Sequence, residues 1–217
     1  MEGSRPRILK FLQQCGRASV DQLAKEIGLA SATVRRHLDI LQRDHLIAYD
    51  QVKKKTGRPE YVYYLTEHGQ EGQPKGYDRL LSGVLLELGA LSHDEATTHS
   101  GPELLQTMLR RVARQAVGGL LRSSSKDSFS ARLSRVKKIV EQEGFSPEIE
   151  QVDGSARIWL RNCPFRRVSM TNAAVCTYDK ALLSEILGSE PVLESTIRDG
   201  GHWCSYLTSD PEHPQAI

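Results

Sequence analysis

The sequence predicts a protein of the α+β class, in which an N-terminal helix-turn-helix and a basic β-hairpin precede a small mixed C-terminal domain. Three observations predict this arrangement. Apolar residues recur at helical spacing in short segments of residues 7–43. Two β-rich runs follow within residues 46–65, separated by turn-forming and basic residues. Further along, two alternating runs flank Asp153-Gly154, a dipeptide that favours a two-residue hairpin turn.

Three short helices are predicted at the N-terminus. The first covers residues 7–14 and should end at Cys15-Gly16, because glycine readily adopts the left-handed cap conformation. The second begins at Ser19 to Gln22, which has the form of a capping box, and reaches Gly28, while Ser31 is expected to cap the third. A tight glycine turn between two short helices is typical of a helix-turn-helix. The apolar stripes behind these predictions are Ile8, Leu9, Phe11 and Leu12, then Val20, Leu23, Ala24 and Ile27, then Val34, Leu38 and Leu41.

The third helix offers a polar face opposite its buried stripe. At about 100° per residue, Ala32, Thr33 and Arg36 lie on or near this face, and Arg36 points most directly outward. A recognition helix needs small residues to enter the major groove and an arginine to donate paired hydrogen bonds to guanine or phosphate. A plain solvated face would carry similar charges. The candidate DNA contacts of this helix are Ser31, Thr33, Arg35, Arg36 and Arg43.

A basic hairpin is predicted directly after the third helix. Residues 46–49 and 61–65 form its strands, and the tip between them contains Gly57 and Pro59. A lysine- and arginine-rich hairpin after a helix-turn-helix is the wing of a winged helix, whose charges engage phosphates or the minor groove. We therefore expect residues 1–68 to form a domain that binds double-stranded operator DNA. The candidate contacts of the wing are Lys53, Lys54, Lys55 and Arg58.

Composition narrows the class of protein. The 217 residues have room for two domains, and 26% charged with 39% hydrophobic residues describes an ordinary folded protein. The net charge of +2 is too small to identify a nucleic-acid partner, although positive charge gathers between Arg35 and Arg58. No apolar run approaches the roughly 20 residues of a transmembrane helix, and the N-terminus has no signal-peptide core. We expect no membrane partner and a cytoplasmic location.

The middle of the chain divides into a linker and a helical segment. A polar, glycine-containing stretch at residues 69–77 is interpreted as the linker. Residues 78–122 contain two amphipathic stripes, one from Leu80 to Leu91 and one from Leu104 to Leu121. We interpret them as a dimerisation segment, because one winged helix covers half of a DNA site and a homodimer supplies the second copy. Packing within one chain would produce the same stripes.

Residues 128–210 are predicted to form a small α+β domain, and they contain three of the four cysteines. Twelve residues separate Cys163 from Cys176, and twenty-seven separate Cys176 from Cys204, whereas Cys15 stands alone. The three are expected in a loop, at a helix start and at a strand edge, which can converge on one pocket. A helix N-terminus would favour a thiolate at Cys176.

The chemistry of this cysteine set leaves several interpretations open. Thiolates are soft ligands that suit iron–sulfur clusters, zinc or copper(I). The spacing contains no C-x2-C pair, which weakens the zinc-ribbon interpretation. Iron–sulfur clusters usually take four protein ligands, and only three thiols are present in this domain. Buried and inert cysteines are the remaining possibility, because free cysteine is among the most buried residue types.

A family resemblance bears on the choice. The stretches "LASATVRRHLDILQRDHLI" and "KKTGRPEYVYYLTEHG" resemble bacterial winged-helix repressors, and "RNCPFRRVS", "VCTYDKALLSEIL" and "GGHWCSYL" resemble the C-terminal domain of the SufR family. The resemblance covers nearly the whole chain. It implies a homodimer that represses iron–sulfur cluster assembly genes while it holds a cluster, typically of the 4Fe–4S type. It also implies that Cys163, Cys176 and Cys204 are the cluster ligands.

The resemblance does not supply the fourth ligand. Some members of the family have a further cysteine in this domain, and this sequence has none there. His202, two residues before Cys204, is one possible ligand, and a small external thiol is another. A carboxylate is the third possibility, with the candidates Asp179, Glu190, Glu194 and Asp199.

Two other hypotheses remain. The cysteines of a winged-helix regulator can instead bind zinc or act directly as redox thiols. The C-terminal domain can also be an enzyme or a small-molecule-binding module. Against an enzyme, the sequence has no phosphate-binding glycine loop and no convincing nucleophile–base pair, although Cys163 and His202 could mimic one. We expect a protein that is not an enzyme.

Overall fold

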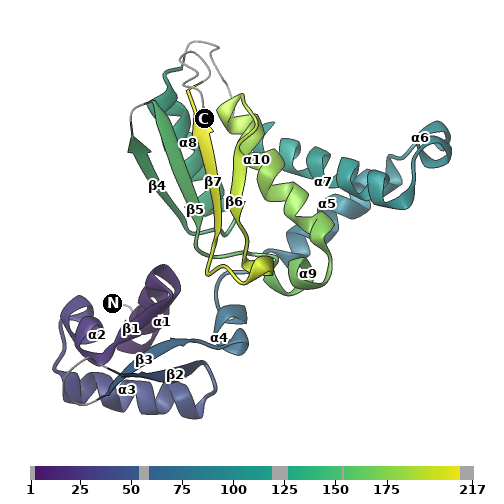
Figure 1. Cartoon of the computed structure of the whole chain (residues 1–217). Coiled ribbons are helices and arrows are strands. Elements are labelled where there is room, and N and C mark those ends of the chain that lie inside the picture. Colours follow the sequence, from purple (N-terminus) through teal and green to yellow (C-terminus); the bar gives the residue numbers. More distant parts are fainter. Residues whose placement is uncertain (1–2, 54–58, 119–126, 153, 211–217) are drawn as a thin grey trace. The chain divides into compact units, whose positions relative to one another are not determined.

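The computed structural model describes residues 3–53, 59–118, 127–152 and 154–210. The chain divides into two compact units, Met1–Pro74 and Lys75–Ile217, so the boundary falls inside the expected linker 69–77 (Figure 1). None of the described helices is long and apolar enough to cross a membrane.

The first unit contains the predicted helices and hairpin. It consists of α1 (Ser4–Cys15), β1 (Arg17–Ser19), α2 (Val20–Ile27), α3 (Ser31–Arg43), β2 (Ile47–Val52), β3 (Glu60–Leu65) and α4 (Glu67–Glu71). The strands form an antiparallel sheet in the order β1-β3-β2. This arrangement of helices and sheet is a winged helix-turn-helix. Its core is built from the predicted stripes together with Ala18, Ile47, Tyr63 and Leu65.

Local signals fix the ends of these helices. The Ser19 hydroxyl accepts a hydrogen bond from the backbone of Gln22, and the Gln22 side chain accepts one from the backbone of Ser19, which confirms the capping box. Gly16 and Gly28, with φ of 77° and 72°, follow α1 and α2 as expected. The prediction that Ser31 caps α3 is wrong. Ala30 is the N-cap, and the Ser31 hydroxyl instead donates to Asp21 at 3.2 Å.

The first residues of the expected linker belong to α4, which packs tightly on the preceding loop. The Thr66 hydroxyl accepts from the backbone of Gly69 and donates to the carbonyl of His45. A Cβ at Gly69 would lie 2.0 Å from the carbonyl oxygen of Leu46, so only glycine fits at this close approach. The helix therefore closes the winged-helix unit.

The second unit combines helices with one antiparallel sheet. Its helices are α5 (Tyr77–Gly89), α6 (His93–Thr98), α7 (Gly101–Gly118), α8 (Phe129–Gln142), α9 (Arg166–Thr171) and α10 (Thr177–Leu187), with the 3₁₀ helices η1 (Ala173–Cys176) and η2 (Ile197–Asp199). Its strands β4 (Pro147–Val152), β5 (Ser155–Leu160), β6 (Val192–Ser195) and β7 (Cys204–Ser209) lie in the order β4-β5-β7-β6. The predicted β4–β5 hairpin is confirmed.

The two helices expected for dimerisation differ in what they bury. The apolar stripe of α7, including Leu109 and Val112, belongs to the same core as α8, α10 and the sheet, so packing within the chain accounts for it. Helix α5 lies beside α7 in Figure 1, and Gly83 lets it approach Val112. The outer side of α5 carries the exposed leucines Leu81, Leu85, Leu86 and Leu88.

Candidate nucleic-acid interface and cysteine cavity

Helix α3 presents the expected polar face to solvent. Val34, Leu38 and Leu41 are buried in the core of the unit, which leaves Arg36 on the opposite, exposed side. Ser31 at the start of the helix is half-buried, and its hydroxyl donates to Asp21. The exposed candidate contacts are Thr33, Arg35, Arg36 and Arg43 on α3 and Lys53 after β2. The remaining wing candidates, Lys54, Lys55 and Arg58, lie outside the described residues.

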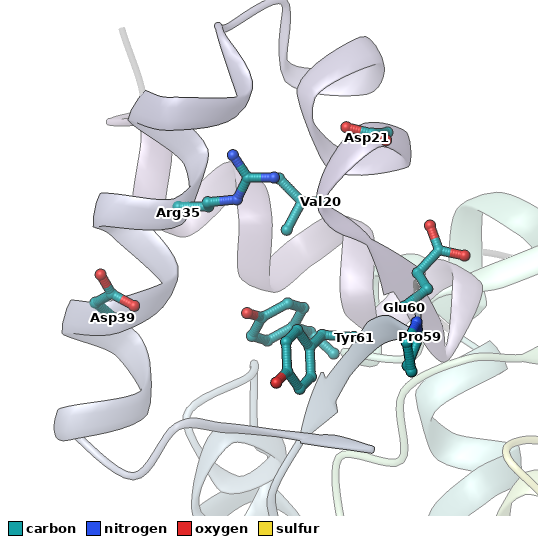
Figure 2. Close-up of a pocket in the computed structure, with 8 residues that line it drawn as sticks. Val20, Asp21, Arg35, Asp39, Pro59, Glu60 and Tyr61 are labelled. Carbon is teal, nitrogen blue, oxygen red and sulfur yellow. The ribbon is translucent and has the colours of Figure 1, made fainter. Parts of the chain in front are cut away.

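Arg35 and Arg36 have different surroundings. Arg35 extends into a hollow of about 570 Å³ between α2, α3 and the start of β3, as Figure 2 shows. Three carboxylates, those of Asp21, Asp39 and Glu60, also line this hollow. Carboxylates repel phosphate groups, although they can accept a hydrogen bond from cytosine. Arg36 is exposed and does not line this hollow.

Tyrosines cover the wing beside this hollow. Tyr49 on β2 faces Tyr63 on β3 in the sheet register, and its ring lies 5.6 Å from that of Tyr63 and 4.9 Å from that of Tyr61. Burial, followed by the nearby charge of Asp39, raises the pKa of Tyr63. Tyr49 and Tyr61 remain exposed. The alternation within residues 61–65 contains the signal for this cluster, because residues two apart in a strand share one face.

The comparison with protein families concerns this unit. Residues 1–48 match the family of winged helix-turn-helix DNA-binding domains. The match ends at the beginning of the hairpin, and the observed β2–β3 wing completes the same architecture. A comparison with curated proteins gave no match. The similarity and the fold together support a DNA-binding transcription regulator, whose partner is DNA.

The second unit brings together the three cysteines of the C-terminal domain. Cys163 lies in the loop after β5, Cys176 ends η1 directly before α10, and Cys204 is the first residue of β7. All three line one small cavity of about 10 Å³. Cys15 belongs to the first unit, at the end of α1. The rest of the cavity wall consists of Phe145, Phe165, Ser169, Val175, Asp179 and Ile197.

Burial keeps these thiols protonated in the structure. Burial, with a smaller contribution from the charge of Asp179, raises the pKa of Cys163 to about 11 and that of Cys176 to about 12. The same two causes raise the pKa of Cys204. The expectation of a thiolate at Cys176 is therefore wrong for this state, because the helix N-terminus does not compensate for the loss of water.

Of the expected fourth ligands, only Asp179 lines the cavity. His202 is exposed and contacts the ring of Trp203. Three other candidates have partners elsewhere, since Glu190 pairs with Lys180, Glu194 with Arg157, and Asp199 with the hydroxyl of Thr196. His202 therefore does not pair with Cys163 at the cavity.

The types of donor atom at the cavity are types that can bind an iron–sulfur cluster. Three soft thiols and one carboxylate share the cavity, and this set suits iron or zinc. Their spacing does not yet form a metal site, because the described residues contain no group of three or more His, Cys, Asp or Glu placed to hold an ion. A cavity of about 10 Å³ must open before a cluster can enter.

Cys176 is also a wall of a larger surface hollow. This hollow has a volume of about 520 Å³ and lies between α7, α10 and β6. It is lined by the cations Arg110, Arg114 and Lys180 and by the acids Glu185 and Glu190. Since Cys176 borders both spaces, it links the buried cysteine cavity to the surface.

Proposed function

We propose that the chain is a homodimeric repressor of the SufR type, which binds operator DNA through its first unit and holds an iron–sulfur cluster in its second. The observation that carries the proposal is the convergence of Cys163, Cys176 and Cys204 on one cavity. These cysteines are far apart in the sequence, and they are the ligands that the resemblance names. When bound, an iron–sulfur cluster supplies a group that is lost on oxidation or iron shortage.

The first unit supports the DNA-binding part of the proposal. In a winged helix, the recognition helix enters the major groove while the wing contacts the backbone or the minor groove. The exposed side of α3 places Arg36 for such contacts, and Lys53 begins the basic tip after β2. We infer that Arg36 reads a base or binds a phosphate and that the wing adds sequence-independent affinity.

The exposed face of α5 supports a homodimer. Leu81, Leu85 and Leu88 follow the spacing of one helical stripe, and 59%, 55% and 53% of these residues is exposed. Half-exposed leucines in a continuous stripe are typical of an interface. A second copy that packs its α5 on this stripe would cover both apolar faces by two-fold symmetry. Such a dimer would present two recognition helices to a pseudo-palindromic site.

Contacts between elements connect the cysteine cavity with this face. Cys176 is the N-cap of α10, α10 packs on α7, and α7 packs on α5. A movement of Cys176 on opening of the cavity would thus be passed to α10 and through α7 to the leucine stripe. This path supports a regulator in which occupancy of the cysteine site changes the spacing of the two DNA-binding units.

Two alternatives use the same three cysteines. Direct redox sensing needs a reactive thiolate, as cluster binding also does, and burial raises the pKa of all three thiols, so the content of iron and sulfide decides between the two. Zinc remains a chemical competitor, because zinc also binds thiolates and carboxylates. Metal analysis decides between them, since zinc without sulfide would exclude a cluster.

The test is purification of the protein without oxygen. Iron, acid-labile sulfide, visible absorption and operator affinity are measured before and after removal of the cluster. We expect iron and sulfide in wild-type protein and weaker operator binding after their loss. Replacing Cys163, Cys176 or Cys204 with serine should abolish the cluster, whereas Cys15→Ser is the matched control that keeps it. Operator affinity that does not depend on the cluster would contradict the sensing role.

A further inference from the structure

We propose that Asp179 is the fourth protein ligand, so that three thiolates and one carboxylate would hold the cluster. The inference rests on the proposed function, because it concerns the same cavity. It assigns a ligand that the three cysteines leave open and that neither the sequence pattern nor the family match identifies.

The position of Asp179 within the fold carries the proposal. Asp179 lies in the first turn of α10, three residues after Cys176, and its side chain lines the cavity with all three cysteines. The residue is only 7% exposed. It is thus a buried carboxylate whose neighbours in the cavity are the three thiols, Ser169 and apolar side chains.

The orientation of the Asp179 carboxylate on α10 is fixed from β7, the strand that also carries Cys204. The hydroxyl of Tyr206 donates to Oδ2 of Asp179 at 2.7 Å, and Tyr206 is buried on β7 two residues after Cys204. Burial raises the pKa of this carboxyl to about 6, against the opposing influence of the Tyr206 hydroxyl and of the nearby backbone N–H groups of Asp179 and Lys180. A carboxylate offers about four acceptor positions, so the bond to Tyr206 leaves it able to bind a cation. Such outer partners are a regular feature of metal ligands.

No cation of the described part of the chain pairs with Asp179. Its carboxylate accepts a hydrogen bond from Tyr206, but no lysine, arginine or histidine among the described residues forms an ion pair with it. Glu143, another buried acid of this unit, bonds to Tyr178 in the same way and in addition pairs with Arg79 at 3.0 Å. Iron bound by the adjacent cysteines would place a cation beside the Asp179 carboxylate, as Arg79 lies beside that of Glu143.

The experiment compares variants of the full-length protein after anaerobic loading with iron and sulfide. Asp179→Asn keeps the size of the side chain and its bond to Tyr206 but removes the charge. Asp199→Asn is the matched control, because Asp199 is exposed and outside the cavity. We expect the iron that Asp179 binds to become labile. Oxidation by ferricyanide should then give the electron paramagnetic resonance signal of a three-iron cluster at least about ten-fold faster than in wild type, since even outer-shell partners are worth about 10–100-fold.

A second variant and a second measurement keep the test decisive if Asp179→Asn misfolds. Asp179→Cys should retain four irons and change the resonance of the reduced cluster. Wild-type protein is also produced in cells supplied with aspartate whose side-chain carboxyl carbon is ¹³C. A carboxylate bound to the reduced cluster should then show a ¹³C hyperfine coupling. This coupling should vanish in Asp179→Cys.

The possible failures are distinguishable. Wild-type protein without iron and sulfide would overturn the proposed function and this inference with it. A wild-type cluster without ¹³C coupling would overturn the inference alone. An Asp179→Asn cluster that oxidises at the same rate as that of Asp199→Asn would do the same.

Discussion

The exposed leucine stripe of α5 gives a quantitative prediction about assembly. Full burial of one leucine side chain contributes about 1.5–3 kcal/mol. Leu85 is 55% exposed, so covering the rest of its surface would contribute roughly 0.8–1.7 kcal/mol in each protomer. In a two-fold symmetric dimer the residue counts twice, which gives about 1.6–3.3 kcal/mol. A factor of ten in affinity corresponds to about 1.4 kcal/mol.

We therefore expect Leu85→Glu to raise the dissociation constant of the dimer by at least about ten-fold, because the substitution removes apolar area and places like charges together. Sedimentation velocity over a dilution series measures this constant. Folding stability should change by less than about 0.5 kcal/mol, since Leu85 is exposed within the chain. Leu193→Glu, at an exposed leucine on β6, is the control. A monomeric wild type, or equal dimerisation of both variants, would refute the reasoning.

Three further predictions concern other parts of the chain. Arg36→Ala should weaken operator binding by about 1–3 kcal/mol, measured by fluorescence anisotropy. Arg35→Ala should weaken it by less, because three carboxylates line the same hollow as Arg35. The reverse order would contradict the placement of the DNA-reading face. Gly69→Ala should destabilise the protein by about 2 kcal/mol or more in urea unfolding, because a Cβ there would lie 2.0 Å from a carbonyl oxygen, and an unchanged midpoint would count against this packing. Hydrogen bonds from Arg111 and Ser92 lower the pKa of Glu95 to about 2, so the stabilisation it provides is present above its usual value of 4.5 and is lost as the pH falls toward 2. A carboxyl titration by nuclear magnetic resonance should show this midpoint, and Arg111→Ala should return it toward 4.5.

Much of the first unit could be predicted because its signals are local. The capping box at Ser19 and the glycines at positions 16 and 28 define helix ends within a few residues of sequence. Strand β1, Arg17–Ser19, has too few residues to show an alternation, and its pairing with β3 depends on contacts far along the chain. The requirement for glycine at position 69 could not be predicted either, because the Leu46 carbonyl that excludes a side chain there comes from another loop.

At the cysteine cavity, the sequence could predict the set of cysteines but not which further residue lies beside them. The sequence identified Cys163, Cys176 and Cys204 as a set, since loops and element ends commonly converge. It could not choose among the possible fourth ligands, because their distinction is one of burial. Asp179 lies in the first turn of α10 and lines the cavity, whereas His202 is exposed and does not line it, although it is closer to Cys204 in the sequence. The protonated state of Cys176 also depends on burial, which a helix N-terminus in the sequence does not reveal.

The order of strands in the second sheet gives the cavity one stationary wall. Cys204 belongs to β7, which is hydrogen-bonded on one side to β5 and on the other to β6. Cys163 lies in a loop and Cys176 at the end of a single 3₁₀ turn, and neither belongs to the sheet. When the cavity widens, Cys204 should keep its place while Cys163 and Cys176 shift. Under the proposed function, Cys176 would be the ligand whose displacement reports the state of the cavity, because it directly precedes α10, the helix that packs on α7.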